Sequence, residues 1–281
     1  MRALFGPGGN SDAFKIWGGK STLDAPRFVS EIGLDAYEYE AGNGIASSPS
    51  MLASIGKEAK KYGIKMSFHT PYFISLSGIE EEKRLKSIKY ISDSLEAARL
   101  LGADIIVVHT GSAAKISRDE AMRLAADTLV KTLSAVDTFG IKIGLETMGK
   151  QNQLGTLDEV LELCRIDSSF APVVDFGHLN ARDCGGVFTT PDDYKRVFDK
   201  IDRKLGAECA EKLHCHFSKI EWTDKGEKKH LTFADTQFGP PYEPLMEAVH
   251  RLGISPRFIC ESDGTMAEDA LAMKKYYQNL A

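Results

Sequence analysis

The segment Asp104–His109, which reads DIIVVH, decides the fold, because four consecutive β-branched residues lead into a histidine. A short apolar run without polar alternation is typical of a strand buried on both faces, as in a parallel sheet. Seven other segments have the same character. The complete set of predicted strands is Arg2–Phe5, Ala36–Tyr39, Lys65–His69, Asp104–His109, Lys142–Glu146, Pro172–Asp175, Leu213–Phe217 and Arg257–Glu261.

Longer segments with apolar residues at helical spacing lie between these strands, and Ile79–Leu101 and Asp119–Phe139 are the clearest. Four glycines follow helical stretches, where C-cap glycines are common: Gly63, Gly102, Gly140 and Gly253. Eight strand–helix units in 281 residues predict an α/β protein with one (β/α)8 TIM-barrel domain over residues 1–281. An open doubly wound sheet is the alternative, but the glycines of Gly6–Gly9 lack the spacing of its phosphate-binding turn.

The composition excludes several classes of protein. Lys and Arg number 35 against 40 Asp and Glu, so the net charge of −5 excludes nucleic-acid binding by overall basicity. A local basic patch, or metal ions in an acidic pocket, remains compatible with that charge. The five cysteines form no C-x-x-C pair, which argues against a disulfide framework or a cysteine-only zinc site. No apolar run reaches the roughly 18 residues of a membrane span, and the start resembles no signal peptide. We expect a cytoplasmic monomer without membrane association.

Six of the predicted strands deliver an imidazole or a carboxylate at or near the carboxyl end. These residues are His69, His109, Glu146, Asp175 with His178 three residues on, His214 and Glu261. Because active sites of barrels form at that end, we expect the side chains to converge on one pocket. Any single one of them is adequately explained as a hydrogen-bonded histidine or a helix cap. Together, without thiolates, they suit divalent ions such as zinc, manganese or iron.

Crowded carboxylates repel one another unless cations lie between them, so a site with two or more ions is predicted. Among the seven histidines, His230 also fits the pocket, whereas His250 lies in a helical stretch and is interpreted as structural. The role of His216 stays open. Period-two alternation places it on the same face as His214, where it would line the pocket without binding a metal.

Six segments together resemble the endonuclease IV family, which are metal-dependent apurinic/apyrimidinic endonucleases among the xylose-isomerase-like TIM barrels. The resemblance covers nearly the whole chain. The segments are FHTPY (68–72), VVHTGS (107–112), GLETMGK (144–150), VVDFGHLNA (173–181), LHCHFSK (213–219) and CESDG (260–264).

This resemblance implies two or three divalent ions, with zinc expected and manganese or iron as alternatives. His69 and His109 would bind one ion, and Glu146 would bridge it to a second held by Asp175, His214 and Glu261. His178 and His230 would hold the third. Glu261 and Glu146 are the expected catalytic residues, and Tyr72, His216 and Lys219 the expected substrate-binding residues. The implied reaction is hydrolysis of the phosphodiester 5′ to an abasic site in duplex DNA.

The chain departs from the family at two places. Lys228 occupies the Asp position of the family's Asp-x-His motif, so the third ion is absent, weakly bound, or completed by Glu227 or Asp235. The loop Glu40–Gly44 is small, where the family carries bulky residues that penetrate DNA. A sugar isomerase or epimerase that uses one ion at Glu146, Asp175, His214 and Glu261 is therefore the alternative function. A binding protein without catalysis is a third interpretation, against which the retained ligands argue.

Overall fold

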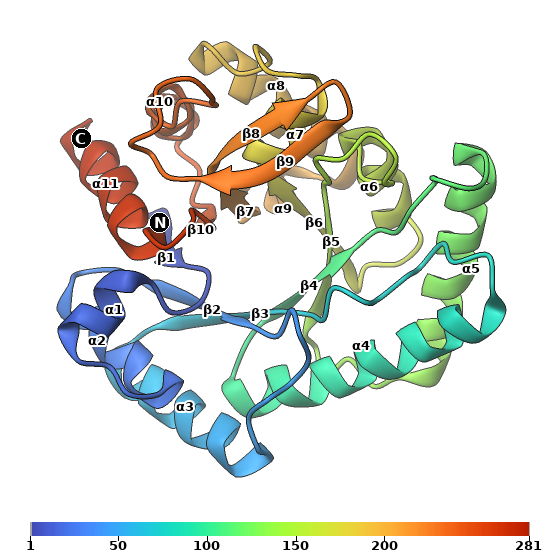
Figure 1. Ribbon diagram of the computed structural model, residues 1–281, viewed down its shortest axis with the longest axis horizontal. Helices are drawn as coiled ribbons and strands as arrows, with labels where there is room; N and C mark the ends of the chain where they lie inside the picture. The colour runs from blue at the N-terminus through green and yellow to red at the C-terminus, as the bar shows by residue number, and fades with distance from the viewer. Residues whose placement is uncertain (1, 281) are drawn as a thin grey trace.

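A computed structural model describes residues 2–280 of the chain. Its main sheet holds eight parallel strands in the order β1-β10-β7-β6-β5-β4-β3-β2. Gly8, just after β1, pairs in parallel with Glu38 of β2, so the two edges of the sheet meet. The strands therefore close into a barrel, with both termini at the same side (Figure 1), and the predicted (β/α)8 TIM barrel is confirmed. The strands are β1 (Leu4–Pro7), β2 (Ala36–Glu40), β3 (Lys65–His69), β4 (Ile105–His109), β5 (Lys142–Glu146), β6 (Phe170–Asp175), β7 (His214–Phe217) and β10 (Arg257–Cys260).

All eight predicted strands are present, and each end is within two residues of its predicted position. Helices surround the barrel (Figure 1). They are α1 (Asp12–Trp17), α2 (Ala25–Glu31), α3 (Pro49–Tyr62), α4 (Glu81–Leu101), α5 (Arg118–Ala135), α6 (Leu157–Cys164), α7 (Phe176–Arg182), α8 (Pro191–Leu205), α9 (Ala207–Glu211), α10 (Glu243–Leu252) and α11 (Met266–Asn279), with one 3-10 turn at Thr22–Asp24.

Glycine caps end three of the four helices for which they were predicted. Gly63, Gly102 and Gly253 take left-handed backbone angles directly after α3, α4 and α10. The prediction at Gly140 is wrong, because α5 already ends at Ala135 and the next residue is extended. Gly140 instead belongs to the turn that leads into β5, where its φ is 75°.

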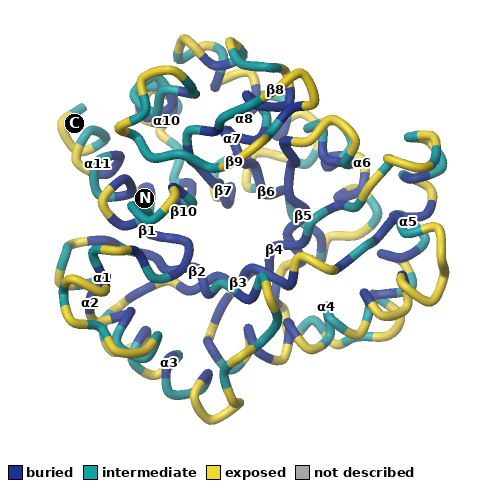
Figure 2. Tube along the Cα trace, in the orientation of Figure 1, coloured by how far each residue is buried: buried dark blue, intermediate teal, exposed yellow. Residues whose placement is uncertain are grey.

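Two different environments fill the protein. The main apolar core lies between the sheet and the helices, so the strands are buried while the outer helix faces are exposed (Figure 2). Inside the barrel the apolar cluster is small, with Ile105, Val107 and Val173 as its buried members. Above and beside that cluster the interior is polar, and its buried residues include Glu38, Glu146, Asp175, His214 and His216. Barrel interiors are ordinarily filled by Val, Ile and Leu, so this polar filling points to function.

A β-hairpin that was not predicted follows β7 and lies over the carboxyl end of the barrel strands (Figure 1). It consists of β8 (Lys219–Thr223) and β9 (Gly226–Leu231). The amide of Glu227 donates to the carbonyl of Gly149, and Gly226 bridges to Lys150, so the hairpin is fastened to the loop after β5. In the described part of the chain, no helix combines the length and apolarity needed to cross a membrane.

Candidate metal centre

Three groups of imidazoles and carboxylates lie side by side at the carboxyl end of the barrel. Within each group, ligand atoms lie within 4.8 Å of one another. The groups are His69 with His109 and Glu146; Glu146 with Asp175, His216 and Glu261; and His178 with Glu227 and His230. Glu146 belongs to two groups and so joins them. Of the predicted ligands, the structure brings together all but His214.

The first group forms at the ends of β3, β4 and β5, which are neighbours in the sheet. Nε2 of His69 lies 3.6 Å and Nε2 of His109 3.2 Å from the same oxygen, Oε2 of Glu146. Tyr72 covers this group, since its ring stacks on His109 with centroids 5.4 Å apart and is 57% exposed. A ligand entering the pocket would therefore meet the Tyr72 ring before the metal-binding groups.

In the second group His216 takes the place expected for His214. Nδ1 of His216 lies 3.0 Å from Oε1 of Glu146 and 3.2 Å from Oε1 of Glu261. Both histidines face the barrel interior, as alternation requires, but their rings lie at different depths, with centroids 5.4 Å apart. His214 lies deeper, where its Nε2 is 2.9 Å from Glu38. The expected grouping of His214 with Glu261 is therefore corrected to His216.

Asp175 has two roles that the sequence left as alternatives. One carboxylate oxygen caps α7 by accepting a hydrogen bond of 2.8 Å from the amide of His178. The other, Oδ2, is buried, has no hydrogen-bond partner among the described residues, and belongs to the second group. The cap also fixes the first turn of α7 and with it the position of His178.

The third group is completed by Glu227, one of the two replacements considered for the missing aspartate. Pairing along the hairpin shifts register, because Glu221 faces Lys229 while Trp222 faces Glu227. Lys228 is thus the extra residue of a β-bulge, which lets Glu227 and His230 reach the same face. Nε2 of His178 lies 3.5 Å from Oε2 of Glu227. Lys228 turns to solvent, where its ammonium pairs with Glu221 at 2.6 Å.

Most of the imidazoles have one nitrogen anchored and the other free. Nδ1 of His69 bonds to the carbonyl of Thr70 at 2.9 Å, and Nδ1 of His178 to the carbonyl of Thr147 at 2.9 Å. Nδ1 of His230 bonds to the hydroxyl of Ser218 at 2.8 Å. Such anchors orient metal-binding histidines, and the two carbonyls, which can only accept, select the tautomer of His69 and His178 that leaves Nε2 unprotonated.

The electrostatics of the centre show an excess of buried carboxylates. Burial, opposed by His216 and reinforced by Glu146, raises the pKa of Glu261 to about 8. Burial likewise raises the pKa of Glu40 to about 7, against the pull of His69. Although burial alone would raise it, the pKa of Glu146 lies well below its usual range because His216 and the other imidazoles stabilise its charge.

The residues present fit divalent ions. Ligand atoms about 2.1 Å from one ion, at angles between octahedral and tetrahedral, lie roughly 3.0–3.4 Å apart. Within the three groups the recorded imidazole–carboxylate pairs lie 3.0 to 3.6 Å apart, and all the ligand atoms of a group lie within 4.8 Å of one another. Among the described residues, Oε2 of Glu146 and Oδ2 of Asp175 are buried without a hydrogen bond. Ions in the first and second groups would satisfy these two oxygens and offset the charge that burial otherwise disfavours.

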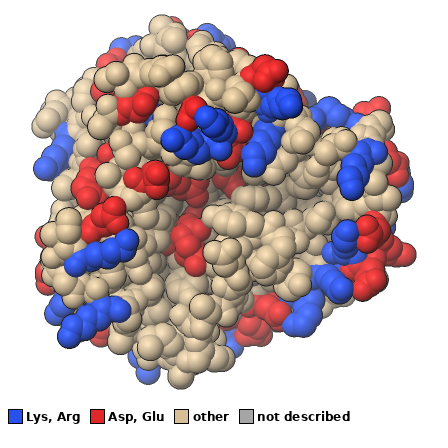
Figure 3. Space-filling view, viewed as in Figure 1, with Lys and Arg blue, Asp and Glu red and all other residues tan. Residues whose placement is uncertain are grey.

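The centre opens into a cavity of about 360 Å³ that also includes Met148, Lys150 and Gln153 in its lining. Carboxylates gather in the central hollow of this face, and lysines and arginines lie on the surrounding surface, including the hairpin (Figure 3). Lys150 is thus placed to contact an anion. Lys219, expected to bind substrate, instead donates from its ammonium to the carbonyls of Phe233 and Asp235 and so holds the loop after the hairpin.

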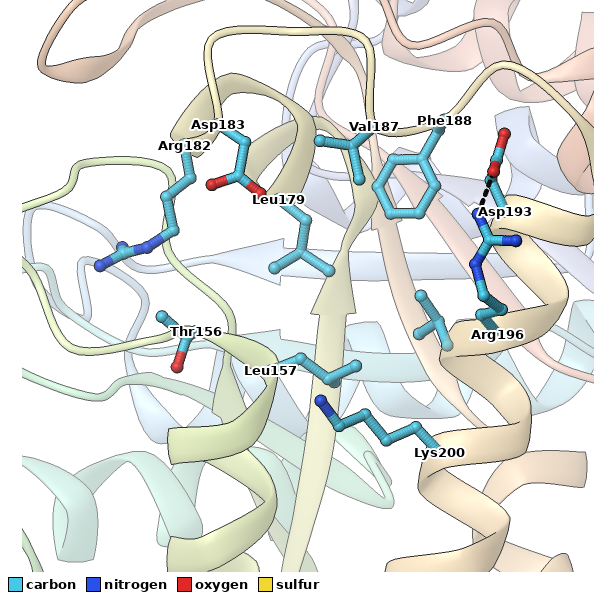
Figure 4. Close-up of a pocket in the computed structure, with 11 residues that line it drawn as sticks. Thr156, Leu157, Leu179, Arg182, Asp183, Val187, Phe188, Asp193, Arg196 and Lys200 are labelled. Carbon is cyan, nitrogen blue, oxygen red and sulfur yellow. Dashed lines mark hydrogen bonds and ion pairs between the residues drawn. The ribbon is translucent and has the colours of Figure 1, made fainter.

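A second cavity of about 340 Å³ between α6, α7 and α8 carries basic residues but is already neutralised (Figure 4). Arg196 pairs with Asp193, and Lys200 lies 2.7 Å from Asp158. The Arg182 guanidinium turns away from the cavity and donates to carbonyls of the loop after β5. The basic residues of this cavity are therefore already paired or turned away from a ligand, and the group of imidazoles and carboxylates at the barrel end is the candidate site.

Glu38 and Glu40 were missed as members of the site. Ala36–Tyr39 was interpreted as an apolar strand, although Glu38 and Glu40 alternate with tyrosines along it. That alternation places both carboxylates on the inner face, and the alternation is the signal that could have identified them.

Comparison with known proteins gives the same fold. The model of a family described as xylose isomerase-like TIM barrel matches residues 26–276. An uncharacterized protein of Methanocaldococcus jannaschii is 30% identical over 90% of each chain. Endonuclease 4 of Thermus thermophilus is 27% identical over 72% of this chain and 74% of that protein. The crystal structure of a D-tagatose 3-epimerase-like protein superposes with a TM-score of 0.73 over 99% of this chain and 97% of that one, at 20% identity.

Proposed function

The chain belongs to the xylose isomerase-like TIM barrel family, and on that premise we propose that it is an apurinic/apyrimidinic endonuclease. The proposed reaction is hydrolysis of the phosphodiester 5′ to an abasic site in duplex DNA, as a step of DNA repair. One observation carries the proposal: His69 and His109 add a separate ligand pair to the Glu146, Asp175, His216 and Glu261 group. A sugar isomerase that holds one ion has no need of that pair. Similarity to proteins named endonuclease 4 supports the same activity.

Two or three divalent ions, with zinc expected, would supply the Lewis acidity that activates a water and neutralises charge on the phosphate. Glu146 would contribute a ligand atom to an ion in each of the two groups to which it belongs. Glu261 is the partly exposed member of the second group, and it would accept a proton from the attacking water. Lys150 would contact a phosphate oxygen, and Tyr72 would pack against the exposed deoxyribose.

Cleavage of an oligonucleotide tests this proposal directly. The protein, loaded in turn with zinc and manganese, is incubated with a duplex that carries one abasic-site analogue. We expect a cut 5′ to the analogue that disappears in His109→Ala. Affinity for the duplex should fall steeply as salt is added, because phosphate contacts release counterions. Absence of cleavage by protein shown to hold its ions would refute the endonuclease.

A metal-dependent sugar isomerase or epimerase is the second candidate, and the shape of the site favours it. The cavity of about 360 Å³ suits a small molecule, and the loop after β2, Ala41-Gly42-Asn43-Gly44, carries no bulky side chain to penetrate DNA. A Cβ at Gly42 would lie 2.2 Å from the ring of Tyr72, so that loop is closely packed against the aromatic residue. Conversion of ketohexoses by the same metal-loaded samples, without salt-sensitive DNA binding, would establish this alternative.

A further inference from the structure

Glu38 is a carboxylate enclosed in the barrel directly beneath the second group. It is 0% exposed, and among residues 2–280 its charge is paired only with two imidazoles. Oε1 lies 2.8 Å from Nε2 of His216, and Oε2 lies 2.9 Å from Nε2 of His214. A buried charge held by no Lys or Arg is costly, so its retention calls for a role beyond packing.

His216 is oriented opposite to the other anchored imidazoles. In His69, His178 and His230 Nδ1 contacts a carbonyl or hydroxyl and Nε2 is left for the pocket. In His216 it is Nδ1 that hydrogen-bonds to Oε1 of Glu146 at 3.0 Å, whereas Nε2 lies 2.8 Å from Oε1 of Glu38 without a hydrogen bond among the described residues. Glu38 therefore stands where the backbone carbonyl stands for His69 and His178.

We propose that Glu38 is the positioning residue of His216, an inference that rests on the proposed metal site. In the ion-loaded protein Glu38, already 2.8 Å from Nε2, would accept the proton of that nitrogen, which would leave Nδ1 unprotonated and free to bind the ion shared with Glu146 and Glu261. A carboxylate behind a metal-binding imidazole also increases its strength as a ligand. His214 completes the arrangement by donating from its own Nε2 to the second oxygen of Glu38. His214, which the sequence predicts to bind a metal, thus contacts Glu38, and Glu38 in turn contacts the ligand His216.

Glu38, His214 and His216 also have the composition of a metal site, but the two histidines contact different oxygens of Glu38 and lie closer to them than any imidazole–carboxylate pair recorded in the three groups. Ligands of one ion lie roughly 3.0–3.4 Å apart, whereas the separations here are 2.8 and 2.9 Å. The 2.9 Å contact of His214 with Glu38 is a hydrogen bond, and the 2.8 Å contact of His216 with Glu38 is a close pair of an imidazole and a carboxylate.

The test measures metal binding and not catalysis. Zinc affinity is determined by competition with a chelator for the wild type, Glu38→Gln and His214→Asn, and the cobalt-substituted proteins are compared by their visible spectra. We expect Glu38→Gln to lower the affinity for one ion by roughly 10- to 100-fold and to change the cobalt spectrum. Glu38→Asp should recover part of the affinity. Ser67→Ala is the matched control, because Ser67 faces Glu38 in the sheet, is buried, and has no hydrogen-bond partner among the described residues.

A second measurement needs no variant and so does not depend on folding of Glu38→Gln. Long-range ¹H–¹⁵N correlation spectra of the zinc-loaded wild type identify the tautomer of each histidine. We expect His216 to be protonated at Nε2 and metal-bound at Nδ1, and the opposite assignment would overturn the inference. Unchanged affinity in Glu38→Gln, or loss of a whole ion from both Glu38→Gln and His214→Asn, would overturn it as well. A wild type that binds no divalent ion would instead refute the proposed function, and this inference with it.

Discussion

Replacing Glu227 and its neighbour Lys228 in turn tests which of the two binds the third ion, because the bulge points their side chains in opposite directions. Glu227 faces His178 and His230, whereas Lys228, whose side chain is 55% exposed, pairs with Glu221. Glu227→Gln removes one of three protein ligands from the third group, and we expect its ion to bind at least about 100-fold more weakly. Lys228→Gln should leave every ion in place, since exposed pairs contribute little.

The expected size of the effect follows from linkage. An ion present at about 100 times its dissociation constant stabilises the folded protein by about 2.7 kcal/mol, and a 100-fold loss of affinity removes nearly all of that. Unfolding of 281 residues has an entropy of about 0.6 kcal/mol/K near the melting temperature. Glu227→Gln should therefore lower the Tm by about 4 °C in the presence of zinc, and by little in chelator.

Calorimetry with and without chelator checks the Tm, and elemental analysis after dialysis at a fixed free zinc concentration counts the ions. Lys228→Gln, one residue away, is the control. Retention of the full ion count by Glu227→Gln, or loss of an ion from Lys228→Gln, would refute the assignment of Glu227 to the third group and the argument from the bulge.

Three other changes test separate parts of the centre. His216→Asn should reduce cleavage of an abasic duplex at least about 100-fold, because it removes a ligand, whereas His214→Asn should reduce it far less; equal losses in single-turnover assays would contradict this. The pKa of Glu261 is raised to about 8 and that of His178 to about 9, so the protonated forms of both groups stabilise the ion-free fold. This stabilisation is lost as the pH rises through those values. The Tm in chelator should therefore fall between pH 7 and 9, by about 2 °C or more, while that of the zinc-loaded protein should not; a flat profile in chelator would count against the raised values. Arg182→Met leaves the carbonyls of the loop after β5 without their buried donor, so it should destabilise the protein by about 3 kcal/mol in urea unfolding. An effect below about 1 kcal/mol would show that the loop keeps its conformation without Arg182.

The barrel and most of the metal centre could be predicted because both depend on local patterns. Each strand is a short apolar run, and the last residue of a buried strand reaches the same end of the barrel as the last residue of its neighbours. His69, His109 and Glu146 follow from that rule alone. His214 and His216 do not, because alternation specifies the face of a strand while depth along the barrel depends on the register with β6 and β10.

Glu227 and Glu38 show two further limits. A ligand at Glu227 depends on the bulge, and a single unpaired residue leaves no periodic trace in a six-residue strand. Glu38 could have been noticed from the alternation Tyr37-Glu38-Tyr39-Glu40, but its partner His216 lies 178 positions later in the chain. Such a pairing is set by closure of the barrel and not by any local pattern.

The polar filling of the barrel has a consequence for the cell. Its small apolar cluster leaves the interior to groups whose charges call for cations, so metal supply should govern how long a newly made chain survives. A difference of 1–2 kcal/mol in stability changes the abundance of a protein several-fold through proteolysis. Under metal starvation we therefore expect ion-free molecules to be degraded, so that the amount of protein falls while the remaining molecules stay loaded with ions. Its steady-state amount would then follow zinc nutrition even without transcriptional control.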